Sequence, residues 1–128
     1  FNIDMSSISV SDLQGGGKKS LERHLKNEDF FDVNNFPIAT LEFSSRTENI
    51  IKNKLSLASE LTVKNISNPL KFSAQIIEAS PQLKIKADIV FDRSIYDVRY
   101  GSGKFFENLG DRLILDEVQI GAILLFNL

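Results

Sequence analysis

Residues 83–91 read LKIKADIVF, and every second residue in this stretch is apolar. The apolar positions are Leu83, Ile85, Ala87, Ile89 and Phe91. Two lysines, an aspartate and a valine occupy the positions between them. Because successive side chains of a β-strand point to opposite faces of a sheet, this alternation is typical of a strand that buries one face. The stretch therefore predicts a half-buried β-strand.

The same period-two pattern recurs in four other segments, residues 39–43, 55–63, 70–76 and 118–126. The first ten residues also alternate, but the phase of the pattern changes after Met5. A bulge at Ser6 and Ser7 would absorb that change of phase. The pattern thus predicts six β-strands.

The segments between the strands indicate how the strands are connected. Short turn sequences, NNFP, NISNP and ASPQ, separate consecutive strands, which favours antiparallel pairing. Residues 18–26, KKSLERHLK, lack β-branched side chains and predict one short helix. Most strands have a polar second face, so we expect an all-β fold, a closed barrel or a strongly curled sheet.

Length and charge place bounds on the class of protein. The 128 residues fit one domain, residues 1–128, and the net charge of −2 gives no reason to expect a nucleic-acid partner. The chain has no cysteine, no apolar run long enough to span a membrane and no leader sequence before the first strand. Because the alternation is already under way at Phe1, we expect the natural protein to have further chain before it.

Small residues occupy the middle of several apolar rows. They are Ser59, Ala74, Ala87 and Ala122, with Ala39 nearer the start of its strand, and large aliphatic or aromatic residues flank them. If these positions meet at one height, the barrel is hollow at its waist and accepts an apolar ligand. Alternatively, small and large residues alternate only to fill the taper of a packed barrel. The pattern alone favours the packed alternative, because protein interiors are generally close-packed.

Three blocks of the sequence resemble one known family. Residues 24–45, HLKNEDFFDVNNFPIATLEFSS, are similar to the signature of the YceI-like family of lipocalin-like, polyisoprenoid-binding proteins. Residues 61–76 resemble that family's hairpin, and residues 87–126 resemble its longer-loop branch. The hairpin tip departs from the family pattern at Asn65, Ile66 and Asn68.

The resemblance implies an antiparallel, eight-stranded lipocalin-like β-barrel. Only six strands are predicted here, so the barrel is expected to be incomplete at its N-terminus. Unpaired strand edges invite pairing with another chain, which makes a homodimer through open edges an expectation.

The resemblance also implies a function, namely non-catalytic binding, storage or transport of a long-chain isoprenoid, quinone-like or similar amphiphilic lipid. It implies a periplasmic or secreted location and no cofactor, and it favours the hollow waist. The residues expected to line the lipid are Phe43, Leu57, Leu61, Phe72, Ala74, Ile85, Ala87, Ile89, Ile120, Ala122 and Leu124. The residues expected at the mouth are Phe30, Phe31, Phe105 and Phe106.

Two motifs resemble nucleotide-binding or catalytic features, but neither has the residues or the spacing that such a site requires. Residues 100–104, YGSGK, contain glycines and a lysine, but the spacing is not that of a phosphate-binding loop. His24 and Glu28 are too few to form a structural zinc site, and the chain has no nucleophile elbow. We therefore expect no metal and no enzymatic activity.

Alternating charges at the end of the strand over residues 83–91 have two interpretations. Asp92, Arg93, Asp97 and Arg99 could form a network of ion pairs that anchors the following loop. Alternatively, Arg93 or Arg99 could bind the lipid head group. A rival for the whole function is a protein-interaction module with a solidly packed barrel and aromatic recognition loops.

Overall fold

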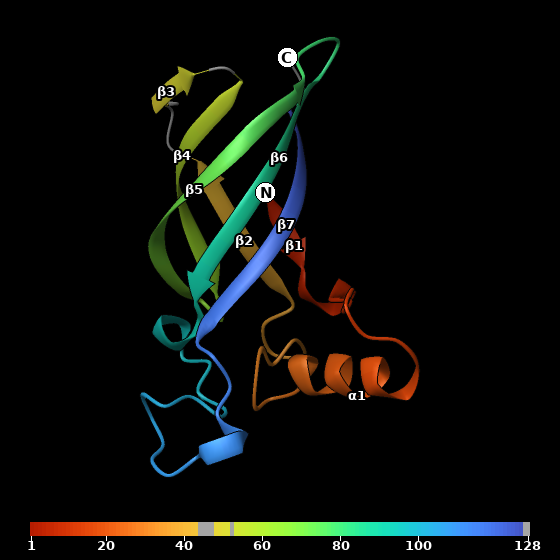
Figure 1. Cartoon of the computed structure of the whole chain (residues 1–128), viewed down its shortest axis with the longest axis vertical. Helices are drawn as coiled ribbons and strands as arrows, with labels where there is room; N and C mark the ends of the chain where they lie inside the picture. Colours follow the sequence, from red (N-terminus) through yellow and green to blue (C-terminus); the bar gives the residue numbers. More distant parts are fainter. Residues whose placement is uncertain (44–47, 52, 127–128) are drawn as a thin grey trace.

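The computed structural model describes residues 1–43, 48–51 and 53–126, which form a curled antiparallel sheet with one helix beside one end (Figure 1). The strands are β1 (Asn2–Asp4), β2 (Ile38–Phe43), β3 (Glu48–Ile51), β4 (Lys54–Val63), β5 (Ile66–Glu78), β6 (Leu83–Asp92) and β7 (Glu117–Phe126). The helices are α1 (Gly15–Lys26) and the short 3-10 turns η1 (Met5–Ser7), η2 (Arg93–Tyr96) and η3 (Gly110–Arg112).

The strands follow one another across the sheet in the order β1-β2-β4-β5-β6-β7, and β3 pairs with β4. All pairings among these described strands are antiparallel. Within the described residues, β1 and β7 are the two ends of the strand order, so the sheet is a half-barrel. The expected antiparallel, lipocalin-like fold with one helix, incomplete as a barrel, is confirmed.

The N-terminal segment differs from its prediction. Strand β1 ends at Asp4, and the expected bulge at Ser6 and Ser7 is instead the 3-10 turn η1. The cause is local, because the Asp4 carboxylate accepts hydrogen bonds from both the backbone N–H and the hydroxyl of Ser6. Such side-chain bonds offer the backbone an alternative to the strand ladder.

Two further elements were predicted incompletely. Helix α1 begins at Gly15, three residues before the predicted start, and Gly15 itself has a positive φ of 68° that glycine adopts readily. Strand β3 was not predicted. Its residues carry no alternation of their own, and only their pairing with β4 defines them as a strand.

The buried side chains gather on the concave face of the sheet and at the end nearest α1. Strands β2, β4, β5 and β6 each bury alternate residues, as the period-two pattern predicted. Phe30, Phe31 and Val33, which follow α1, extend the same core, as do Tyr96 and Val98 after β6. The loops at this end therefore contribute side chains to the core of the domain.

Strand β2 offers a direct test of which face is buried. Leu41 is 3% exposed, whereas Ile38 in the same strand is 48% exposed. We expect Leu41→Ala to lower the free energy of unfolding by about 2–5 kcal/mol, since it leaves a cavity in the core. Ile38→Ala is the matched control and should change it by about 0.5 kcal/mol or less. Equal effects in urea denaturation of the two variants would contradict this assignment of the faces.

Candidate ligand-binding site

A row of alanines crosses the concave face of the sheet. Ala74 of β5 pairs directly with Ala87 of β6, and Ala87 pairs with Ala122 of β7. On the other side Ala74 pairs with Leu55 of β4. Directly paired residues of an antiparallel sheet have Cα atoms about 4.5–5.5 Å apart, so the three methyl groups form one continuous line. We call Ala74, Ala87 and Ala122 the alanine row.

Large apolar residues border the alanine row on both sides. Ile76, Ile85 and Leu124 are paired across the strands on one side. On the other side Leu57 pairs with Phe72, and Ile89 pairs with Ile120. The alanine row is therefore a band of small buried or partly buried side chains between two bands of large apolar ones, at the level where the sequence predicted small residues to meet.

Ser59, also predicted to lie at this level, does not belong to the row. It pairs with Phe43 and Leu70, nearer the other end of β4. Its hydroxyl donates a hydrogen bond of 2.8 Å to the Leu70 carbonyl oxygen, so this small polar residue is satisfied within the sheet. Ala39 is likewise separate, because it pairs with Ile3 at the β1 end of the sheet.

The residues predicted to line the site fall into two groups by exposure. Seven of them are buried in one apolar cluster: Leu57, Leu61, Phe72, Ala74, Ile85, Ala87 and Ile89. Phe43, Ala122 and Leu124 are partly buried and pack against that cluster. Ile120 is 45% exposed because it lies on β7, an end strand of the described sheet. The structure thus brings ten of the predicted residues together and leaves Ile120 at the margin.

The four phenylalanines predicted for the mouth are also divided. Phe30 and Phe31 are buried, and their rings contact each other edge-on at 5.8 Å. Phe105 and Phe106 are exposed on the loop after β6. Phe30 and Phe31 therefore belong to the core, and of these four residues only Phe105 and Phe106 face solvent.

Arg93 is enclosed at the same end of the sheet, with an exposed fraction of 1%. Its guanidinium donates hydrogen bonds to the carbonyl oxygens of Val98, Ile114 and Leu115, at 2.8, 3.0 and 3.1 Å. The guanidinium carbon also lies 5.0 Å from the centre of the Phe30 ring, a cation–π contact. Arg93 thus connects both arms of the loop to the core.

The charge of Arg93 is balanced by Asp116, whose carboxylate lies 3.7 Å from the guanidinium. Burial lowers the pKa of Arg93, and the nearby carboxylates of Asp116 and Asp92 oppose that effect. With its donors directed to backbone carbonyls, Arg93 is arranged as an anchor for the loop. The geometry favours the anchoring interpretation over a head-group contact for this residue.

The remaining charges form exposed pairs around the anchor. Arg99 pairs with Asp97 and lies over the Phe105 ring at 4.7 Å. Lys104 donates hydrogen bonds to the Asp92 carboxylate and to the Ser94 hydroxyl. Partial burial raises the pKa of Asp92, but hydrogen bonds from Lys104 and Ser94 outweigh burial and lower it overall.

His24 packs between aromatic rings. It lies edge-on to Tyr100 at 4.5 Å and to Phe30 at 5.4 Å. These contacts attach α1 to the loop after β6. The described residues contain no group of three or more histidine, cysteine, aspartate or glutamate side chains placed to hold a metal ion.

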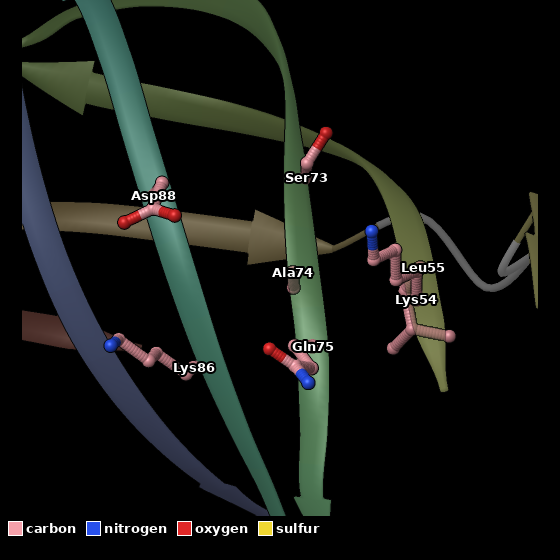
Figure 2. Close-up of a pocket in the computed structure, with 7 residues that line it drawn as sticks. All are labelled: Lys54, Leu55, Ser73, Ala74, Gln75, Lys86 and Asp88. Carbon is pink, nitrogen blue, oxygen red and sulfur yellow. The ribbon is translucent and has the colours of Figure 1, made fainter. Parts of the chain in front are cut away.

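A cavity of about 380 Å³ lies on the opposite, convex face of the sheet (Figure 2). Exposed polar side chains of β4, β5 and β6 line it: Lys54, Ser73, Gln75, Lys86 and Asp88. The buried residues Leu55 and Ala74 contribute only at its floor. Polar or charged side chains make up most of the lining, and Ala74 of the alanine row also borders this cavity.

Sequence reasoning missed several residues of both faces. Leu55 and Ile76 lie beside the alanine row in the apolar core, and their alternation could have identified them. The partners of Arg93 and the polar cavity depend on strand register and loop path, for which the sequence carries no comparable signal.

Comparison with known proteins assigns the family. A model described as the YceI-like domain matches residues 1–124, so the chain belongs to the YceI-like family. The fold resembles the crystal structure of the Campylobacter jejuni YceI protein, with a TM-score of 0.72 and 16% identity over 99% of this chain and 70% of that one. It also resembles Burkholderia cenocepacia BcnA, with a TM-score of 0.74 and 22% identity over 97% of this chain and 70% of that one. A search of curated proteins found no match.

One further property follows from the helices. In residues 1–43, 48–51 and 53–126, no helix is both long and apolar enough to cross a membrane.

The anchoring role of Arg93 can be tested by substitution. We expect Arg93→Ala to lower the free energy of unfolding by about 3–5 kcal/mol, because it leaves the Asp116 carboxylate without its partner in a partly buried site. Arg99→Ala is the control, since its ion pair is exposed and should contribute about 1 kcal/mol or less. An Arg93→Ala variant with unchanged stability in urea denaturation would refute the anchor.

The Asp92–Lys104 pair predicts a dependence on pH. Because the pKa of Asp92 is lowered in the folded state, its contribution is complete above the unfolded value of about 4 and disappears as the pH falls through the folded value. We expect the difference in melting temperature between wild type and Asp92→Asn to shrink below about pH 4. A difference that stays constant from neutral pH to pH 3, measured by circular dichroism, would show that the carboxylate charge is irrelevant.

Proposed function

We propose that the protein binds the apolar chain of an isoprenoid-like lipid along its concave face and performs no chemistry on it. Membership of the YceI-like family supports this proposal, because the family is associated with isoprenoid-like lipids. The observation that carries it is the alanine row, a line of small side chains between two bands of large apolar ones. A lipid chain would occupy the channel that opens along this row when the neighbouring core side chains move apart.

The energetics of such a ligand are those of apolar burial. Each methylene removed from water contributes roughly 0.8 kcal/mol, so a long chain can bind tightly with few polar contacts. Such binding selects for length and apolar character. We propose that the lipid is an isoprenoid or a quinone-like amphiphile, and that the protein works in the periplasm or outside the cell.

The concave face is closed over by its own side chains in the structure. Ala87 is fully buried and Ile85 is 2% exposed, so a lipid must separate core side chains to reach the alanine row. Entry is easiest beside β7, where Ala122 and Leu124 are only partly buried. Since β1 and β7 end the described strand order, a second copy of the chain pairing along these edges would enclose the lipid, and we propose such a dimer for the loaded state.

Replacing an alanine of the alanine row with a larger residue should exclude the lipid. We expect Ala122→Phe to abolish uptake of a long-chain isoprenoid alcohol, because the ring fills the channel from its margin, where folding tolerates it. Ala87→Phe should do the same and also cost about 1–3 kcal/mol of stability through overpacking. The measurement is native mass spectrometry of delipidated protein mixed with the alcohol.

Val90→Phe is the matched control, because Val90 is an exposed residue on the outer face of β6. It should take up the alcohol as wild type does. A folded Ala122→Phe variant that retains wild-type uptake would exclude the channel as the site. If wild-type protein takes up no isoprenoid alcohol at all, the rival interpretation of a packed interaction module stands.

A further inference from the structure

Tyr96 is a polar side chain enclosed in the apolar core. It belongs to the turn η2, which follows β6 at the end of the sheet nearest α1 (Figure 1). Its exposed fraction is 1%, and it lies in the same buried cluster as Ala74 and Ala87. Its hydroxyl makes no hydrogen bond to any residue that the structure describes. Most buried polar side-chain atoms have a hydrogen-bond partner, so an unpartnered phenol in the core indicates a place for a ligand atom.

The position of the Tyr96 ring is fixed by its surroundings. Lys64, in the hairpin between β4 and β5, donates a hydrogen bond of 3.1 Å to the Asp97 carbonyl oxygen and so attaches η2 to the sheet. The Tyr96 ring lies edge-on to Phe91 at 5.7 Å, whereas the neighbouring Ile95 is 47% exposed. The turn therefore directs Ile95 outward and Tyr96 inward. Burial raises the pKa of the Tyr96 phenol, and no hydrogen bond or charge contributes to that change.

Tyr96 and the alanine row belong to one continuous apolar region. Phe91 and Ile89 are the buried residues of β6 that lie between η2 and Ala87, and all of them are members of the same cluster. A strand rises about 3.3 Å per residue, so Phe91 lies about 13 Å along β6 from Ala87. A lipid with its polar end at Tyr96 would therefore extend past Phe91 and Ile89 toward the alanine row.

The charges around Tyr96 favour an uncharged polar end. Among the described residues, Arg93 is the one charged residue that is buried. Its guanidinium already donates to three carbonyl oxygens and faces the Asp116 carboxylate. A phosphate buried beside Tyr96 would therefore lack a cation of its own, and burial of an unpaired charge is costly. A hydroxyl or carbonyl oxygen needs only a hydrogen-bond donor.

We propose that the Tyr96 hydroxyl donates a hydrogen bond to the uncharged terminal oxygen of the bound lipid, a hydroxyl or a quinone carbonyl. This inference rests on the lipid-binding function proposed above, and it adds the class of polar head group and the end of the core where that group lies. The lipid oxygen supplies the partner that the described residues do not provide. A lipid without oxygen binds through apolar burial alone.

The test compares three probes: geranylgeraniol, geranylgeranyl monophosphate and squalene, an isoprenoid hydrocarbon without oxygen. Tyr96→Phe should weaken binding of geranylgeraniol by roughly 3- to 10-fold, the effect of one neutral hydrogen bond, and leave binding of squalene unchanged. Wild-type protein should bind the monophosphate about tenfold or more weakly than the alcohol. The measurements are native mass spectrometry titrations of delipidated protein.

Tyr100→Phe is the matched control, because it removes the same atom from an exposed tyrosine at the same end of the molecule. It should bind geranylgeraniol and squalene as wild type does. In this variant Tyr96 is the single tyrosine of a chain without tryptophan, so the near-ultraviolet absorbance reports on its phenol. We expect the absorbance to move to longer wavelength when geranylgeraniol binds, because the phenol then donates a hydrogen bond.

Stability gives a second readout that separates a ligand contact from a structural one. Since the hydroxyl has no partner to lose, Tyr96→Phe should keep or raise the wild-type melting temperature. A lowered melting temperature would overturn the proposal, as would tighter binding of the monophosphate than of the alcohol.

The head-group proposal and the lipid-binding proposal fail in different ways. A Tyr96→Phe variant that binds geranylgeraniol as wild type does, or that loses alcohol and squalene equally, would overturn the role of Tyr96 and leave lipid binding in place. If wild-type protein binds none of the three probes, the lipid-binding function fails and the role of Tyr96 fails with it.

Discussion

The register between β5, β6 and β7 is the constraint on which the other features depend. A shift by one residue in any of these strands would send its apolar side chains to the opposite face. The observed register pairs Ala74 with Ala87 and Ala87 with Ala122, so three small residues coincide where any other register would scatter them. The alanine row and the large apolar side chains that border it on both sides follow from that coincidence.

The loop at the end of the sheet beside α1 depends on a different interaction. There the buried guanidinium of Arg93 donates hydrogen bonds to backbone carbonyl groups. Arg93 donates to the backbone oxygens of Val98, five residues later, and of Ile114 and Leu115, 21 and 22 residues later. This arrangement gives a long loop a defined shape although the loop has little regular secondary structure. The concave face holds the apolar core, whereas this end presents an ordered external surface.

Much of the fold could be predicted from the sequence because apolar and polar residues alternate along the strands of a half-buried sheet. The strands from β4 to β7 and the identity of the inner face follow from that pattern, and ten of the eleven residues predicted to line the lipid lie in or against one apolar cluster. The turn at Asp4 was missed because two hydrogen bonds to its carboxylate outweigh a weak alternation. The fate of Arg93, Phe30 and Phe31 could not be foreseen, because burial of loop residues depends on tertiary path and not on local period.

The alanine row has a mechanical consequence. At the same level of β5, β6 and β7 the outward neighbours are also modest in size, since Ser73, Asp88 and Gly121 pair across the convex face. The wall is therefore thin there, with little side-chain bulk on either surface to resist bending. We therefore expect the sheet to bend more readily at this level than at its bulkier ends while the backbone hydrogen bonds between the strands are kept.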